Sequence, residues 1–401
     1  MNILFITIAY SLNSGGIYSD LCEALAGRGH RVKVAFSDNS LPDGVAGEIA
    51  SKGGVEVLRV KSPQVQKVGL VKKGLAFLRL PSVMKAGIEK FYGGERFDLI
   101  IALAPPVSLC SVYAWAKRKY KCPVFLMQKD IFPQNAVDLG MFSKLNPAYW
   151  FFRMQERKML SVSDRIGCMS QGNIDYIKKH NPDIDSQCVV MFPNTMKVMP
   201  QRPDAPKVDR KKYGIPGDAC VFLFGGNIGV PQHIELLEAA MERFDGRRDI
   251  FFVCIGSGAK AAELRSFVRS RNFSNSAFFD ALPREDYEAL AASCDVGLVT
   301  LSPKFTIPNY PSKTLSYMAT RLPILAATDL NTDYRDLVES QAKCGLWCDS
   351  ARPADFFANI ERLASDAALR AELGANGRRY LEENFDVSRS AEIIEAFLGG
   401  E

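Results

Sequence analysis

The stretch CVFLFGGNIGVP, residues 220–231, runs from apolar residues through a glycine loop to a proline. The apolar run predicts a buried strand. Pro231 suits the first position of a helix, and Ile234 and Leu237 then recur at helical spacing. The order strand, loop, helix repeats along the whole chain. It predicts an α/β protein whose parallel sheets are covered by helices on both faces.

Short apolar runs mark the other expected strands: 3–9, 31–36, 55–60, 99–102, 124–127 and 165–169 in the first half, and 250–255, 277–279, 296–300 and 324–327 in the second. Between the two series lies Asn194–Asp218, which is rich in proline and charge and predicts a linker. We expect two Rossmann-like, doubly wound domains, 1–195 and 196–384, facing a central cleft. A helix at about 385–401 is expected to pack back on the first domain.

The composition is that of an ordinary soluble enzyme. A chain of 401 residues with 47% hydrophobic content is larger than one core usually supports, which also favours two domains. The net charge of +5 is mild and mostly dispersed, so no nucleic acid partner is expected. Neither an export signal nor a membrane-spanning segment is recognisable, so a cytoplasmic protein is expected.

Ten scattered cysteines without a C-x-x-C pair indicate reduced, buried thiols. A zinc site at Cys344 and Cys348 is the alternative, but it lacks a second pair of ligands and the chain has only three histidines. No zinc site is therefore expected at these cysteines, and no cofactor is expected elsewhere in the chain.

Three glycine loops follow expected strands: Gly15-Gly16, Gly225–Gly229 and Gly256–Gly258. Glycine lets backbone amides approach a diphosphate closely. The alternative for each loop is that glycine serves only the turn. None matches G-x-G-x-x-G or G-x-x-x-x-G-K-[ST], which argues against nicotinamide enzymes and simple nucleotide triphosphatases.

Thr306–Pro323, TIPNYPSKTLSYMATRLP, places Lys313 in the first turn of an expected helix, with Pro311 at its first position and Ser312 satisfying free amides. The N-terminal end of a helix carries partial positive charge, so a cation is disfavoured there unless an anion lies between them. A phosphate would resolve this conflict. The alternative is a lysine whose ammonium lies in water.

Several sequence blocks occur together in a characteristic order. They are ALAPPVSL, QKDIFPQNAVDLG, RIGCMSQGN and MFPN in the first half, then GGNIG, IGSG, LPREDYEALAASCDVGLVTL, PSKTLSYMA with LPIL, AKCGLWCDS and LGANGRRYLEENF. Over almost its whole length the chain resembles the retaining glycosyltransferases of family 4 with the GT-B fold. Within them it is similar to the bacterial O-antigen and capsule branch that includes fucosamine-type transferases.

The resemblance implies transfer of a sugar from a nucleotide-diphosphate donor, chiefly UDP, with retention of configuration and without a metal. Lys313 would counter the charge of the leaving diphosphate. The positions that match the family's donor site are Gly15, Gly16, Gly226, Asn227, Gly229, Gly256, Leu282, Asn309, Tyr310, Pro311, Ser312 and Ser316. Gly226, Asn227 and Gly229 would line the diphosphate, Gly15 and Gly16 would close over it, and Leu282 would neighbour the base.

Two departures from the family pattern concern charge. Many members carry two glutamates spaced E-x7-E, where this chain has Pro308 and Ser316. Ser316 could still bond a ribose hydroxyl, and Asn309 or Tyr310 could contact the donor sugar. Val230 stands where relatives often have a basic residue, which leaves more of the phosphate charge to Lys313.

Asp130 follows an apolar strand and should lie at its carboxyl end, where it could accept the proton of the acceptor hydroxyl. The alternative is an aspartate that caps the turn before Pro133.

A basic, partly apolar stretch between Lys61 and Lys90 includes Lys67, Lys72 and Lys73, and a second mixed stretch contains Trp150. Both suit an anionic membrane surface. The resemblance implies a glycan or polyprenyl-diphosphate-linked acceptor, hence a peripheral position at the inner face of the cytoplasmic membrane. The alternative is that both are helices whose apolar faces join the core.

Two other functions remain open. A nucleotide-sugar 2-epimerase shares the architecture but needs acids and bases around the sugar. A non-catalytic, transferase-like subunit that binds nucleotide or lipid is suggested by the missing glutamates at Pro308 and Ser316.

Overall fold

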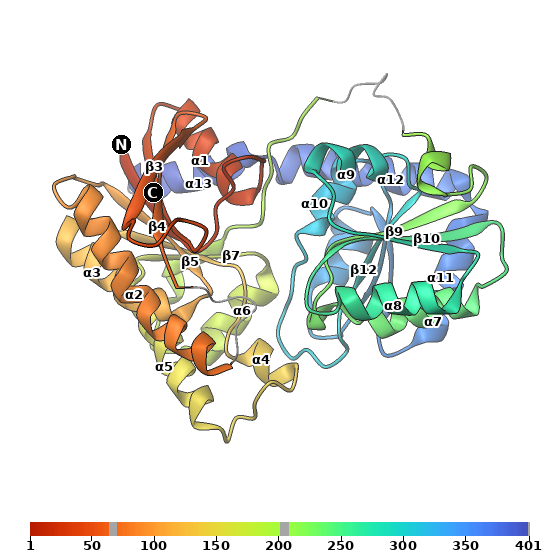
Figure 1. Cartoon of the computed structure of the whole chain (residues 1–401), viewed down its shortest axis with the longest axis horizontal. Coiled ribbons are helices and arrows are strands. Elements are labelled where there is room, and N and C mark those ends of the chain that lie inside the picture. The colour runs from red at the N-terminus through yellow and green to blue at the C-terminus, as the bar shows by residue number, and fades with distance from the viewer. Residues whose placement is uncertain (64–69, 201–207, 400–401) are drawn as a thin grey trace. The chain divides into compact units, whose positions relative to one another are not determined.

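A computed structural model describes residues 1–63, 70–200 and 208–399 of the chain (Figure 1). Contacts divide the chain into two compact units, Met1–Lys197 with Val387–Glu401, and Val198–Asp386. The expected domain boundaries were 195 and 384. We call the two parts the N-terminal unit and the C-terminal unit and describe each by itself.

The N-terminal unit contains an eight-stranded sheet in the order β3-β4-β2-β1-β5-β6-β7-β8. Its strands are β1 Asn2–Thr7, β2 Arg31–Asp38, β3 Gly47–Lys52, β4 Val55–Lys61, β5 Leu99–Ala104, β6 Val124–Gln128, β7 Arg165–Cys168 and β8 Val189–Met191. All neighbours pair in parallel except β3, which runs antiparallel to β4 at the edge. The expected all-parallel sheet is therefore wrong at this one edge strand.

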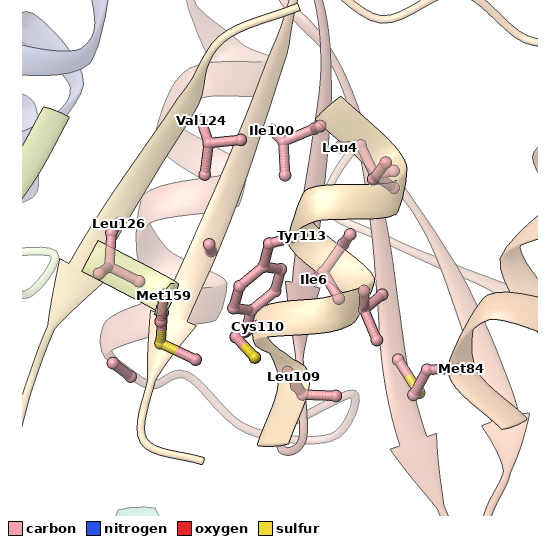
Figure 2. Close-up of a cluster of buried hydrophobic side chains, with 14 of the residues drawn as sticks. Leu4, Ile6, Met84, Ile100, Leu109, Cys110, Tyr113, Val124, Leu126 and Met159 are labelled. Carbon is pink, nitrogen blue, oxygen red and sulfur yellow. The ribbon is translucent and has the colours of Figure 1, made fainter. Parts of the chain in front are cut away.

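Helices cover both faces of this sheet (Figure 1). They are α1 Ile17–Gly27, α2 Leu70–Tyr92, α3 Cys110–Tyr120, α4 Gln134–Asp138, α5 Pro147–Val162, α6 Gln171–His180 and α13 Val387–Gly399, with short 3-10 turns at Val107–Leu109 and Ser186–Cys188. On one face, Tyr113 of α3 and Met159 of α5 pack against strand residues such as Ile100 and Leu126 (Figure 2). Alternate residues of the same strands face the opposite core beneath α1 and α13. This two-sided burial explains why the strands read as continuous apolar runs.

The C-terminal unit contains a six-stranded parallel sheet in the order β11-β10-β9-β12-β13-β14. Its strands are β9 Cys220–Asn227, β10 Ile250–Ser257, β11 Ser276–Phe279, β12 Val296–Thr300, β13 Ile324–Thr328 and β14 Gly345–Asp349. Its helices are α7 Ile234–Arg243, α8 Ala261–Arg271, α9 Arg284–Ala291, α10 Lys313–Ala319, α11 Pro353–Ser365 and α12 Ala367–Asn384. Shorter turns are Arg210–Tyr213, Val230–Gln232 and the π-helical Asp336–Gln341. Both units are thus Rossmann-like, doubly wound α/β folds.

The C-terminal helix α13 packs on α1 of the N-terminal unit (Figure 1). Glu395 of α13 accepts hydrogen bonds from Arg28 at 2.7 Å and lies 2.8 Å from the His30 ring. These partners hold the pKa of Glu395 at about 2. The charge contacts add to the apolar burial of Ala391 and Ile394 against the same layer.

Candidate functional site

Two glycine loops of the C-terminal unit lie together at the carboxyl ends of β9 and β10. The two strands remain paired as far as Gly226 with Gly256 and Asn227 with Ser257. The loops expected after the strands therefore begin later than predicted. Beyond the strands, the Ile228 amide donates to the Ser257 carbonyl at 2.9 Å. Ligands of open parallel sheets bind at this kind of edge.

Glycine is needed in these loops for different reasons. Gly256 has φ +154°, and a Cβ there would lie 1.9 Å from the Gly226 carbonyl oxygen, so it serves the close approach of the two loops. Gly226 has φ +94°, but a Cβ there would meet nothing within 4 Å. Gly226 and Asn227 are exposed, whereas Gly229 is buried. The space beside Gly226 is therefore open to a ligand.

Lys313 is the first residue of α10, as expected, and its ammonium is buried without a hydrogen-bond partner. Its Nζ lies 3.7 Å from the centroid of the Phe224 ring on β9. Burial lowers the pKa of Lys313 to about 7. The thiol of Cys254, the register partner of Phe224, is neutral because burial raises its pKa to about 12. No described group supplies a counter-charge.

A buried ammonium without a counter-charge is costly, and the ring of Phe224 offsets only part of this cost. Phe224 and Gly226 lie two residues apart on β9 and so face the same side of the sheet. An anion over the open side of Gly226 would be next to the ammonium. The geometry fits a phosphate binding position beside an exposed glycine loop and one lysine.

The start of α10 differs from expectation in one respect. Ser312 has helical backbone angles, φ −65° and ψ −20°, and its side chain makes no capping hydrogen bond. An N-cap side chain reaches the following amides only from an extended backbone, so the predicted capping by Ser312 is wrong. Pro311 lies before the cap and not at the first helical position. Ser312 is exposed.

The segment before α10 is held by the loop that follows β13. The Asn309 amide donates to Thr332 Oγ1 at 3.3 Å, and Thr332 donates back to the Asn309 carbonyl at 3.0 Å. The backbone amide of Asn309 is therefore occupied, which leaves only its side chain for a sugar contact. The Tyr310 ring packs edge-on against Tyr334, with ring centroids 5.4 Å apart.

Ser316, at the position where the second family glutamate is missing, has a polar side chain as its neighbour. Its side chain hydrogen-bonds the hydroxyl of Tyr287 on α9. That hydroxyl would lie 2.2 Å from a Cβ at Gly225, so Gly225 makes room for Tyr287. Leu282, half-buried, precedes α9 in the same segment. Sequence reasoning missed Tyr287, because nothing in its local pattern distinguishes it from a core tyrosine.

His233 was also missed. It directly precedes α7 in a left-handed conformation, φ +43°, and its buried Nδ1 has no partner. Burial lowers its pKa, so the ring is neutral at neutral pH. The signal available in the sequence was a histidine, one of only three in the chain, four residues after Gly229.

In the N-terminal unit, Asp130 follows β6, as expected. Its carboxylate accepts from the Ile131 amide at 2.8 Å and from Asn135 Nδ2 at 2.6 Å. These bonds are those of a residue that fixes a turn. Burial nevertheless raises the pKa of Asp130 to about 6, within reach of proton transfer at neutral pH.

The Gly15-Gly16 loop connects β1 to α1. The Gly16 amide donates to Asp20 Oδ1 at 3.0 Å, so this amide is already occupied by a carboxylate. Asp20 is buried and its other oxygen accepts from the Lys197 amide at 3.0 Å. The expected approach of a diphosphate to the Gly16 amide would require that bond to be exchanged.

Comparisons with known proteins match two family models over most of the chain. Residues 17–195 match the family described as "Glycosyl transferase 4-like domain", and residues 207–380 match "Glycosyl transferases group 1". The chain is a glycosyltransferase of the GT-B fold.

Individual similarities are distant but extend over most of each chain. WbjE of Pseudomonas aeruginosa, named a probable glycosyltransferase, is 24% identical over 84% of this chain and 82% of its own length. HepE of Anabaena, solved with UDP and glucose, has a TM-score of 0.70 and 16% identity over 100% of both chains. WaaG, a glycosyltransferase involved in lipopolysaccharide biosynthesis, has a TM-score of 0.68 and 15% identity over 100% of both chains.

The glycosyltransferase carries an exposed apolar surface at the start of α5. Trp150 is 64% exposed and Met154, one turn later, 58%. Leu145, just before the helix, is 92% exposed. Phe152 instead packs inward, edge-on to Phe132 with centroids 5.0 Å apart, so only part of the mixed stretch is a surface.

The basic residues expected to serve the same role are Lys67, Lys72 and Lys73. Lys67 lies outside the described residues. Lys72 and Lys73 belong to helix α2.

The ten cysteines are free, and nine of them are buried. Among residues 1–63, 70–200 and 208–399 no group of three or more His, Cys, Asp or Glu side chains is placed to hold a metal ion.

Proposed function

We propose that this glycosyltransferase transfers a sugar from a nucleotide-diphosphate donor, with UDP as the nucleotide, to a glycan or polyprenyl-diphosphate-linked acceptor in surface polysaccharide synthesis. The observation that carries the proposal is the buried, unpaired ammonium of Lys313 over Phe224, which lies two residues before the open position Gly226. The UDP bound to HepE and the biosynthetic role of WaaG support the donor and the pathway class.

In the proposed reaction the bond between the anomeric carbon and the diphosphate breaks, and the diphosphate takes the bonding electrons. Negative charge develops on the leaving oxygen, where the ammonium of Lys313 would stabilise it beside the exposed residues Gly226 and Asn227. The acceptor oxygen forms the new bond to the anomeric carbon, and its proton passes to a base, for which Asp130 is the candidate. We include retention of configuration and independence from metal in the proposal, because the family resemblance implies both.

The positions without glutamate suggest other donor contacts. The paired hydroxyls of Ser316 and Tyr287 would bond the ribose in place of a carboxylate. Neutral hydroxyls bind more weakly than a carboxylate, so a larger share of the donor affinity would come from the diphosphate.

A panel of UDP-, GDP- and dTDP-sugars in a thermal-shift assay tests the donor. A ligand at 100 times its Kd stabilises the folded state by about 2.7 kcal/mol, which should raise the Tm by roughly 5 °C. We expect this rise for a UDP-sugar and a much smaller one for GDP- and dTDP-sugars. Equal responses to all three nucleotides would contradict the choice of UDP.

A second candidate is a non-catalytic subunit that binds nucleotide or lipid, favoured by the absence of carboxylates at Pro308 and Ser316. Such a subunit would bind the donor but would neither hydrolyse it nor transfer its sugar to a lipid-linked acceptor. Measuring UDP release with and without acceptor separates the two functions.

We further propose that the enzyme acts as a peripheral protein at the inner face of the cytoplasmic membrane. The described residues include no helix long and apolar enough to cross a bilayer. The exposed side chains of Leu145, Trp150 and Met154 suit insertion at the headgroup level, and the exposed Lys144 and Lys158 flank them with positive charge.

Flotation with vesicles that contain anionic lipid tests this surface. Trp150→Ser with Leu145→Ser should lower the partition coefficient onto the vesicles by about 100-fold or more, because each buried apolar side chain contributes roughly 1.5 to 3 kcal/mol. Leu330→Ser, at an apolar side chain 73% exposed in the C-terminal unit, is the matched control and should float like the parent. Charge reversal at Lys67, Lys72 and Lys73 should also weaken binding. Unchanged flotation of the Trp150→Ser, Leu145→Ser variant and of the charge-reversal variant would contradict the membrane proposal.

A further inference from the structure

Lys129 is a second lysine without a counter-charge, at the carboxyl end of β6 in the N-terminal unit. Its amide donates to the Ala104 carbonyl at 2.9 Å, which fixes the backbone beside β5. Its Nζ lies 5.1 Å from the centroid of the Phe192 ring, and the Phe192 carbonyl is 3.4 Å away. The ammonium thus has one long hydrogen bond in place of the three it can donate.

No carboxylate of the described residues lies within ion-pair distance of Lys129. Asp130, the next residue, is bonded to Ile131 and Asn135 instead. The Cys168 thiol interacts electrostatically with Lys129, but burial raises the pKa of this thiol to about 12, so it is neutral. Burial lowers the pKa of Lys129 itself to about 7, as expected for an ammonium that lacks an anion.

A second, independent observation comes from two amide oxygens at the same strand end. Gln128 is only 3% exposed, and its Oε1 has no partner although its Nε2 donates to the Asp130 carbonyl at 2.7 Å. The buried Oδ1 of Asn135 likewise has no partner. Buried acceptors are almost always satisfied in folded proteins, so these oxygens are available to the hydrogen-bond donors of a bound molecule.

We propose that the carboxyl end of β6 binds a phosphorylated saccharide, with the phosphate on Lys129 and sugar hydroxyls donating to Gln128 and Asn135. Gln128 and Lys129 project to opposite sides of the chain, so a ligand lying across the strand end meets both. This inference rests on the proposed function, because it takes the phosphorylated saccharide to be part of the acceptor. Its binding chemistry is independent of the donor position in the C-terminal unit.

Thermal shift of the full chain with glucose 1-phosphate, a sugar phosphate without a nucleotide, tests the proposal. The assay uses the parent, Lys129→Met, Lys313→Met and the double variant, with sodium chloride at equal ionic strength as the reference. In Lys313→Met, glucose 1-phosphate at about ten times its Kd should still raise the Tm by about 3 °C. In the double variant this rise should vanish. An equal rise in both variants would overturn the assignment of Lys129.

Further arms separate the parts of the proposal. Glucose should give no rise, and inorganic phosphate should give a smaller rise than glucose 1-phosphate; equal rises with both phosphates would refute the saccharide part. UDP should stabilise the parent and Lys129→Met alike but not Lys313→Met. If UDP stabilises none of them, the proposed donor function fails while the result for Lys129 stands.

The Tm without ligand distinguishes a binding lysine from a structural one. Replacing an unpaired buried ammonium with methionine should leave the Tm unchanged or raise it. Lys129→Arg should keep the response to glucose 1-phosphate. A Tm that falls in Lys129→Met, with no loss of the ligand response in Lys129→Gln, would identify a structural residue and contradict the proposal.

Discussion

Replacing Lys313 with methionine is expected to lower the turnover of sugar transfer by about 100-fold or more, the usual effect of removing one group that stabilises developing charge. The reason is the position of the ammonium, which is buried over Phe224 with no partner in the free protein. The leaving diphosphate would be its first counter-charge. Because the interaction strengthens as charge develops, kcat should fall more than KM rises.

Lys260 provides a matched control for this substitution. It also precedes a helix at the edge of the same sheet, but its ammonium is already paired with Glu263 at 2.7 Å and Glu235 at 3.7 Å. Lys260→Met should change turnover by less than about threefold, since an exposed ion pair contributes little. The Tm of Lys313→Met should equal or exceed that of the parent, which excludes unfolding as the cause. Parental turnover in Lys313→Met would defeat the catalytic role.

The position of Lys313 at a helix start could be predicted from local sequence, but its environment could not. The pattern PSKTLSYMA specifies a helix and places the lysine in its first turn. The ring beneath the ammonium belongs to Phe224, about 90 positions earlier, and only the packing of α10 against β9 brings them together. Capping by Ser312 was wrong because its backbone angles are helical, φ −65° and ψ −20°, which the local sequence did not reveal.

Two strands of the N-terminal unit were also not predicted from the sequence, for different reasons. β3, GEIASK, is polar and half-exposed at the sheet edge, so it lacks the apolar run used to find strands. A signal was present, since Gly53-Gly54 between β3 and β4 is a hairpin turn sequence. β8 has only three residues, Val189–Met191, too few for any periodicity.

The sequence alone pointed to one of the two lysines without a counter-charge but not to the other. Lys313 conflicts with the positive end of its helix, a contradiction that can be recognised without coordinates. Lys129 follows an ordinary strand, and its isolation depends on Phe192 and Cys168 closing around it. The charge of a side chain can be read from the sequence, whereas its burial depends on the folded unit.

The affinity for UDP is expected to fall by up to about tenfold per pH unit between pH 7.5 and 9, which is the slope for uptake of one proton. Burial lowers the pKa of Lys313 to about 7 in the free protein, so the amine is neutral in this range. A bound diphosphate favours the ammonium, so binding must take up a proton. The free phosphate of UDP, with a pKa near 6, no longer titrates there.

Neighbouring groups do not titrate in the same window. Cys254, which faces the ammonium from β10, has its pKa raised to about 12, and so has Tyr287 on α9. The pKa of His233 before α7 is lowered from 6.5, so its ring is already neutral.

Global unfolding does not produce the same trend. The unfolded chain, in which the lysine keeps its ordinary pKa of 10.5, binds more protons than the folded one above pH 7. Through this group the free protein gains stability as the pH rises, in the opposite direction to the fall in affinity. Titration calorimetry with UDP in two buffers of different ionisation enthalpy measures the proton uptake directly. Lys313→Arg, charged throughout, should bind UDP without pH dependence, whereas Lys129→Met should keep the parental dependence. A parent protein whose affinity is constant from pH 7.5 to 9 would show that Lys313 does not meet the diphosphate.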